Sequence, residues 1–462
     1  MIPRCVAALL ESLRFSDGGA DQCQPRVART VVSAASRLVS TLFPRWPIAR
    51  PTGGELSALR NARHRDESRC GCLKAAPQSE LAAKEQPVFS ESEWKAALYY
   101  FDRNQLTLQL RLPGSVHAAN LAKNQERLQR MKRAFRDVST ALHVANIEFA
   151  VLKGFAHWDR FTTDPALRMQ YDLDLFCPHA AVEARDILTR HLGYESIQGT
   201  EEFPTDHLPP LVRKTGWQWQ GDFFDPEIPV SVDLHFRLWD EATEGFPAPG
   251  VEQFWSRRVE QKLDGQPYLA LDPADALGYA ALHLLRHLLR GELRASSLYE
   301  VAYFLHHNAA NDAFWTRWRD LHGPELRRLQ ALCFRLAAEW FDCRMSAIAR
   351  AEVDLLPGPV QRWFERCAAS PAEAFFRPNK DELWLHLCLL DSFQKKSAVL
   401  RRRLLPTRLP GPLDSVFIPD ERMTWQLWLR KRWQYTRYVV GRGIFHVRAL
   451  LPTLSRMLTS SR

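Results

Sequence analysis

The chain has 462 residues, of which 46% are hydrophobic and 25% are charged, a length and composition typical of a globular protein with two or three domains. It contains no run of about 18 apolar residues, which argues against a transmembrane segment, and its N-terminal apolar stretch is too short for a signal peptide. The net charge of +9 favours anionic partners such as nucleotides, nucleic acid, phosphorylated sugars or an anionic membrane face, although a solvated basic surface explains it equally well.

The nine cysteines are scattered along the chain and form no recognisable site. Cys70 and Cys72 have the wrong spacing for a zinc-binding pair, and no second pair completes such a site. We therefore expect free thiols and a cytoplasmic location.

Residues 1–84 show no sustained hydrophobic periodicity and are predicted to form a disordered tail, with a short helix near 26–42. Residues 85–146 are predicted to be a helical lead-in. Ser90 and Glu93 have the spacing of a capping box. A longer helix is expected at 121–144, with a core-facing stripe of Leu121, Leu128, Met131, Phe135, Val138 and Leu142.

Residues 147–240 alternate between strand and helix patterns and are predicted to form a small α/β unit. Pro178 and Gly193 mark the two ends of its clearest helix. The predicted elements are a strand at 147–152, a turn into a helix at 153–161, a strand at 170–176, a helix at 178–194, and a hairpin of strands 216–224 and 229–239 around a turn at 225–228.

Residues 241–462 are predicted to form a helical C-terminal domain. The clearest helix follows Asp272, which suits an N-cap, and Pro273, which suits the first helical position. The other helices expected here are 296–307, 312–321, 324–342, 381–397 and 421–458.

The last of these helices is basic and aromatic. Its interleaved Arg and Trp residues are typical of nucleic-acid binding or of contact with an anionic membrane face. Packing of the aromatic side chains on the domain is the favoured interpretation, and nucleic acid is not the favoured partner.

Two aspartates stand one residue apart in the predicted strand at 170–176. Side chains at i and i+2 share a strand face, so Asp172 and Asp174 repel each other unless a positive group lies between them. That group is an Arg or Lys, or a divalent cation. Asp233 on a later strand can converge on the pair, and three carboxylates suit Mg²⁺ or Mn²⁺. Neutralisation of the pair by Arg168, without metal, is the alternative.

Lys153 and Gly154 follow the predicted strand at 147–152 and precede a predicted helix. A glycine at this point lets the backbone approach a phosphate, and a helix N-terminus adds partial positive charge. Lys153 and Arg168 supply formal positive charge for a triphosphate. A salt bridge from Lys153 to a surface acid is an equally open interpretation.

These motifs resemble the polymerase beta nucleotidyltransferase superfamily, and most closely its bacterial branch of uncharacterised nucleotidyltransferases. The general order of predicted helices and strands resembles this family over about residues 85–450. The resemblance implies an α+β fold in which a polymerase-beta-like core, a small mixed sheet with helices, is flanked by helical N-terminal and C-terminal regions. The matching residues are Leu152-Lys153-Gly154, Arg168, Asp172-Leu173-Asp174-Leu175 and Asp233-Leu234-His235.

The resemblance also implies a function, which is metal-dependent transfer of a nucleoside monophosphate from an NTP to an unknown acceptor hydroxyl or phosphate. The alternative is a catalytically inactive relative that binds a nucleotide or a protein partner. The implied roles are catalysis and Mg²⁺ or Mn²⁺ binding for Asp172, Asp174 and Asp233, and nucleotide binding for Lys153, Gly154 and Arg168.

Two histidines are candidate substrate-lining residues. His235 shares a strand face with Asp233, although a structural, hydrogen-bonded role is equally open. His283 and His287 are spaced like zinc ligands on a helix, but the segment lacks the Glu of the H-E-x-x-H motif, so a structural or substrate-lining role is favoured. Arg294 and Glu300 are weaker candidates for the same cleft.

Overall fold

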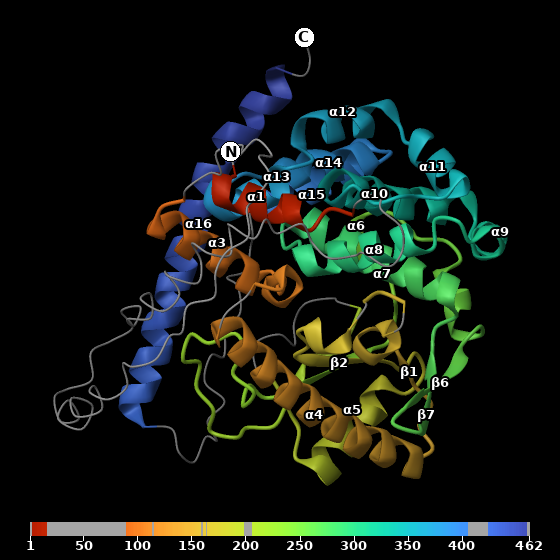
Figure 1. The fold of residues 1–462 in the computed structure, drawn as a ribbon, viewed down its shortest axis with the longest axis vertical. Coiled ribbons are helices and arrows are strands. Elements are labelled where there is room, and N and C mark those ends of the chain that lie inside the picture. The colour runs from red at the N-terminus through yellow and green to blue at the C-terminus, as the bar shows by residue number, and fades with distance from the viewer. Residues whose placement is uncertain are drawn as a thin grey trace, which may run out of the picture.

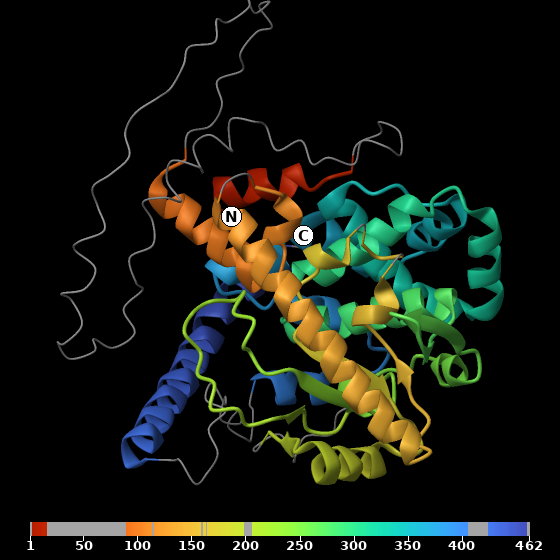
Figure 2. The same ribbon diagram turned by 60° about the horizontal axis from the view of Figure 1, so that its bottom comes forward.

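The computed structural model describes residues 2–15, 89–112, 115–158, 160–162, 164–197, 206–404 and 424–459. A mixed β-sheet lies between two layers of helices (Figure 1), and Figure 2 shows the same arrangement from a second direction. This is the expected α+β class. The seven strands follow the order β3-β4-β5-β2-β1-β7-β6. They are β1 (Ala150–Val151), β2 (Asp172–Phe176), β3 (Glu195–Ser196), β4 (Leu211–Val212), β5 (Ser231–His235), β6 (Val259–Leu263) and β7 (Gln266–Ala270).

Alternation along the two central strands separates apolar from acidic side chains. β2 and β5 are parallel, and Asp174 lies directly opposite Asp233. One face of the sheet packs against α4 (Ser115–Val144) and α5 (Ala181–Leu192). Because successive side chains point to opposite faces, the aspartates face the other helical layer. The side chains of these strands that pack toward α4 and α5 are Leu173, Leu175, Val232 and Leu234.

The helical lead-in has the predicted capping box. Ser90 accepts a hydrogen bond from the backbone N–H of Glu93, whose carboxylate accepts one from the backbone N–H of Ser90, at the start of α3 (Glu91–Arg103). The predicted helix at 121–144 is part of α4, which begins earlier. Its predicted stripe is buried at Met131, Phe135, Val138 and Leu142.

The second helical layer is built around α7 (Pro273–Arg290). The predicted cap is confirmed, because the Asp272 carboxylate accepts a hydrogen bond from the backbone N–H of Ala274. α7 packs against α8 (Ala295–His307), α10 (Pro324–Phe341) and α14 (Asp381–Leu389). The remaining elements of this region are α6 (Glu241–Glu244), η4 (Val251–Trp255), α9 (Asp312–Leu321), α11 (Ala347–Asp354), α12 (Gly358–Cys367), α13 (Ser370–Phe376) and α15 (Phe393–Leu404).

Two predictions about the sheet are wrong. Residues 216–224 form a loop, with φ of 86° at Gly216 and 90° at Gly221, so no hairpin forms there. β5 pairs with β4 and β2 instead. β6 and β7 complete the sheet from a region expected to be helical, and Asp264 and Gly265 form their two-residue turn with positive φ at both. The core therefore extends past the predicted boundary at 240.

The N-terminus contributes α1 (Arg4–Ser12), which lies against α3 and α10. The prediction of a disordered tail is therefore wrong for residues 2–15, while the helix expected near 26–42 lies outside the described residues. The side chains that α1 buries in the main core are Cys5, Val6, Leu9 and Leu10.

α16 (Trp425–Thr459) runs along one side of the molecule (Figures 1 and 2). Its C-terminal part is held to the body, because the Thr453 hydroxyl donates a hydrogen bond of 2.8 Å to Asp381. The favoured packing of its aromatic residues on the domain does not hold for Trp425 and Trp433, which are 70% and 63% exposed. Within the described ranges, no helix is both long and apolar enough to cross a bilayer.

Candidate functional site

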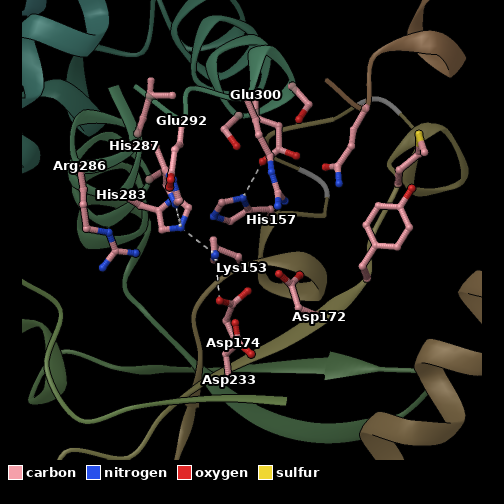
Figure 3. A pocket seen from close by; sticks show the side chains of 18 of the residues that line it. Lys153, His157, Asp172, Asp174, Asp233, His283, Arg286, His287, Glu292 and Glu300 are labelled. Carbon is pink, nitrogen blue, oxygen red and sulfur yellow. Dashed lines mark hydrogen bonds and ion pairs between the residues drawn. The ribbon is translucent and has the colours of Figure 1, made fainter. Parts of the chain in front are cut away.

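A cavity of about 290 Å³ lies between the acidic face of the sheet and the helices α7 and α8 (Figure 3). Its floor is formed by β2 and β5, and its walls by the loop after β1, by α7 and by α8. It is lined by charged and imidazole side chains, among them Lys153, His157, Arg168, Asp172, Asp174, Asp233, His235, His283, Arg286, His287, Arg290, Arg294 and Glu300.

The three predicted acids converge on the cavity floor. One oxygen atom from each of Asp172, Asp174 and Asp233 lies within 4.8 Å of the other two. The parallel register of β2 and β5 sets Asp174 beside Asp233, and the i, i+2 spacing sets Asp172 on the same face. We call these three residues the sheet acids. Carboxylates this close repel one another, so the floor favours a shared cation.

Lys153 supplies the positive charge nearest to the sheet acids. Its Nζ lies 2.8 Å from Asp174 Oδ1 and 3.0 Å from His283 Nε2 (Figure 3). Its partner is thus a buried acid rather than a surface acid. Arg168 forms an ion pair with Glu300 instead, with Nε 2.7 Å from Oε1. The alternative in which Arg168 neutralises the aspartate pair is therefore wrong.

His235 is buried behind the cavity floor and hydrogen-bonds two acids. Its Nε2 lies 3.2 Å from Asp174 Oδ1, and its Nδ1 lies 3.1 Å from Asp206 Oδ2. Burial opposes protonation of the ring, but these two carboxylates outweigh it and raise the pKa of His235. Asp206 in turn forms an ion pair with Arg286. His235 therefore both lines the cavity and holds Asp174 in place.

The sheet acids differ in how many hydrogen bonds and positive charges surround each carboxylate. Burial would raise the pKa of Asp174, but Lys153 and His235 outweigh it and hold that pKa well below its usual range. Burial, followed by the charges of Asp174 and Asp172, raises the pKa of Asp233 to about 7. Asp233 Oδ1 is buried without a hydrogen-bond partner among the described residues. Such an oxygen costs free energy, and a coordinated cation would satisfy it.

Gly154 has a packing reason to be glycine. Its φ is 63°, and an added Cβ would lie 2.1 Å from Gln170 Nε2. Gln170 donates a hydrogen bond of 2.9 Å to the backbone oxygen of Asp172, so this close approach supports the strand that carries the acids. Gly154 does not line the cavity, and it begins the short 3₁₀ helix η2 (Gly154–His157) in place of the longer helix predicted at 153–161. Its phosphate contact stays a prediction.

Glu300 on α8 is a fully paired acid in the cavity wall. It accepts hydrogen bonds from Arg168 and from Nδ1 of His157, the latter at 3.1 Å. Burial would raise the pKa of Glu300, but the charge of Arg168 and the bond from His157 lower it to about 2. Arg294, close to Glu300 in sequence, forms no ion pair with the described residues and adds a further positive charge to the wall.

Two neutral histidines on α7 face the cavity. Burial and the charge of Lys153 lower the pKa of His283, and burial and the charge of Arg286 lower that of His287. Their Nε2 atoms lie 3.2 Å apart. His283 therefore lines the cavity and contacts the lysine that pairs with Asp174.

Sequence reasoning missed Asp206 and Arg286. Arg286 is one of several polar residues that share one face of the otherwise apolar α7, at offsets of three, four and seven residues. Such a polar face on a buried helix indicates that the helix lines a cavity. Asp206 lies in a connection with no local pattern, so its role becomes visible only through its contact with His235. The polar face of α7 consists of His283, Arg286, His287 and Arg290.

The mixed sheet flanked by helical regions agrees with a nucleotidyltransferase core. The family model for uncharacterised nucleotidyltransferases matches residues 98–342, more than half of the chain, and the chain therefore belongs to this family. No curated protein and no solved structure shows significant similarity to the chain.

Proposed function

We propose that this protein transfers a nucleoside monophosphate from an NTP to an acceptor hydroxyl or phosphate. The supporting observation is the convergence of the sheet acids on a cavity whose opposite walls carry cations. The acceptor oxygen forms a bond to the α-phosphorus, and the bond between that phosphorus and the bridging oxygen breaks. Pyrophosphate leaves with the electron pair of that bond.

The cationic side chains of the cavity suit the triphosphate. We assign Lys153 and Arg168 to the phosphate oxygens, because both line the cavity and carry fixed positive charge. Arg294 has no competing ion pair with the described residues and is available for the same purpose. Gly154 remains a candidate backbone contact. Positioning and charge neutralisation supply most of the catalysis in phosphoryl chemistry.

Asp172, Asp174 and Asp233 would hold Mg²⁺ or Mn²⁺. These ions prefer a few carboxylate oxygens together with substrate phosphates, and the unpaired oxygen of Asp233 fits that role. When bound, the cation would neutralise charge on the phosphates and on the acids. Asp233 is also suited to accept the proton of the acceptor, because it lies on the cavity floor beside the other two acids.

A second candidate function is nucleotide or partner binding without transfer. It is favoured by the contact of Lys153 with Asp174, because an ammonium group already occupies part of the space where a metal ion would be coordinated. In this case the cavity would bind an NTP through its cationic wall and leave it unchanged.

Mass spectrometry tests the proposal. The full chain is incubated with each NTP, Mg²⁺ and a cell extract, and products that carry a nucleoside monophosphate are sought together with released pyrophosphate. We expect such a product with the wild type and a loss of at least about 100-fold in Asp172→Asn and Asp174→Asn. Glu260→Gln is the matched control, because Glu260 is an exposed acid on strand β6 of the same sheet.

The two candidate functions give different results. NTP binding by the wild type without any nucleotidylated product would establish the binding function and reject transfer. Equal turnover by the wild type and both aspartate variants would reject the assignment of the sheet acids.

A further inference from the structure

α16 presents an apolar stripe to solvent from Trp425 to Leu454. Eight of its exposed apolar residues are spaced three, four or seven positions apart, which places them on one face of the helix, while Trp428, which is also exposed, lies beside that face. They are all between 47% and 72% exposed. The α16 stripe consists of Trp425, Leu429, Trp433, Val440, Ile444, Val447, Leu451 and Leu454.

The stripe points away from the body of the protein. The residues that α16 buries lie on the other side of the helix, at Ala449 and Thr453. Arg456, on that same side, forms ion pairs with Glu373 and Asp381. Both views show the helix extending past the sheet and helical layers (Figures 1 and 2). Among the described residues, the stripe therefore makes none of the contacts that hold α16 to the body.

The charge of α16 has one sign. Residues 425–459 contain no Asp or Glu. Arg430, Arg437 and Arg448 are exposed and each follows a stripe residue by one or four positions, so they lie along one edge of the stripe. The basic residues of the helix are Arg430, Lys431, Arg432, Arg437, Arg442, Arg448 and Arg456.

We infer that α16 binds the surface of an anionic lipid bilayer. An interfacial helix has an apolar face with Trp and Leu, a polar face rich in Arg and Lys, and low overall hydrophobicity. It lies in the plane of the membrane, with its apolar face at the boundary between headgroups and acyl chains. The arginines beside the stripe then contact lipid phosphates and carboxylates, which adds electrostatic attraction.

Two other occupants fit the helix less well. Nucleic acid is bound by stacking on aromatic side chains and by contacts to phosphates, and the aliphatic residues of the C-terminal half of the stripe serve neither purpose. A second α16 would place two helices of like charge side by side, without the acidic partners that pair flanking cations in coiled coils. An anionic bilayer satisfies both the apolar stripe and the cations.

Vesicle co-sedimentation of the full chain tests this inference. We expect binding to phosphatidylcholine vesicles that contain phosphatidylserine, weak binding to pure phosphatidylcholine, and a decrease in binding as salt is raised. The double variant Trp433→Ser/Ile444→Ser should lose binding. Its control is Val144→Ser/Leu355→Ser, because these are exposed apolar residues outside α16.

A second variant separates charge from apolar contact. Arg430→Gln/Arg437→Gln/Arg448→Gln should weaken binding on the order of a hundredfold, about fivefold for each charge near the surface. Arg328→Gln/Arg350→Gln/Arg366→Gln removes three exposed charges elsewhere and should bind as the wild type does. Circular dichroism confirms that each variant remains folded.

Three results would overturn the inference. The first is a folded wild type that does not bind the anionic vesicles. The second is tighter binding to random-sequence oligonucleotides that survives loss of the stripe. The third is concentration-dependent dimerisation that the stripe variant abolishes while vesicle binding is unchanged.

Discussion

The acids around the cavity fall into two groups with different partners. Glu300 and Asp206 are each held by an arginine and a histidine, which neutralise their charge, although Oδ1 of Asp206 is, like Oδ1 of Asp233, buried without a hydrogen-bond partner among the described residues. The sheet acids are three carboxylates with one nearby ammonium, that of Lys153, and one shared imidazole. The first group resembles ordinary buried ion pairs of a stable core. The second group keeps an excess of negative charge on the cavity floor, where it would attract a cation.

This contrast indicates that the sheet acids are kept close at a cost in stability. A buried ion pair is weakly stabilising at best, but removal of one partner is strongly destabilising. The acids of the first group should therefore behave as parts of the fold, and the least satisfied sheet acid should behave as part of a binding site.

The largest effect is expected at Asp206. Asp206→Ala removes the buried partner of Arg286 and one of the two carboxylates that hold His235, and it should lower the free energy of unfolding by about 3–5 kcal/mol. Urea unfolding monitored by circular dichroism measures this, and Mg²⁺ with NTP should not restore the loss. A variant as stable as the wild type would remove the contrast between the two groups.

The second effect concerns pH and Glu300. Its pKa is about 2 in the folded protein against an ordinary value of 4.5, so the unfolded chain binds more protons between these values. The contribution of Glu300 is complete above pH 4.5 and is lost as pH falls toward 2. Relative to Glu300→Gln, the wild type should lose about 1 kcal/mol per pH unit in that window.

Unfolding curves of both proteins at pH 6, 4.5 and 3.5 measure this difference. Parallel losses of stability in the two proteins would show that Glu300 is not held ionised by Arg168 and His157.

The third effect tests Lys153. If it contacts phosphate, Lys153→Ala should weaken NTP binding by about 1–3 kcal/mol, as measured by isothermal titration calorimetry. Because its Nζ also pairs with the buried Asp174, some loss of stability should accompany the weaker binding. Lys132→Ala is the control, since Lys132 pairs with Asp264 on the surface. Unchanged NTP affinity would show that Lys153 does not contact phosphate and that its role is the ion pair with Asp174.

The smallest effect compares two sheet acids that lie opposite each other. Asp233→Asn removes an unpaired charge and should raise the stability of the protein in EDTA by about 1 kcal/mol. Asp174→Asn should instead destabilise it, because Lys153 loses its carboxylate partner and His235 loses one of its two carboxylates. Both variants should lose the stabilisation that Mg²⁺ and NTP give the wild type.

Thermal melts with and without Mg²⁺ and NTP distinguish the outcomes. Destabilisation by Asp233→Asn, together with a wild type that does not respond to Mg²⁺ and NTP, would contradict the metal site.

The sequence predicted the convergence of the three sheet acids through local alternation. Asp172 and Asp174 share a face because of the two-residue period of a strand, and Asp233 follows the same rule on β5. The capping box at Ser90 and the cap at Asp272 were predictable for the same reason, since each depends on neighbours within one helical turn.

Features that depend on distant contacts were not predictable in this way. The sequence 216–224 is rich in aromatic residues like a strand, but two glycines with positive φ turn it into a loop. α1 has only nine residues, too few for a clear period, and it is stabilised by burial against α3 and α10. Lys153 could not be assigned to Asp174 rather than to a surface acid without the packing of the loop after β1.

The pairing of β7 with β1 has a consequence for folding. Val151 on β1 lies opposite Ala270 on β7, so the strand next to Lys153 gains its second neighbour only after residue 270 has been synthesised. Contacts between such distant positions close a long loop and slow folding. A fragment that ended at 240 would expose the free edge of β1, which invites pairing with other chains. The sheet that carries the acids should therefore mature late during translation, together with the hairpin of β6 and β7.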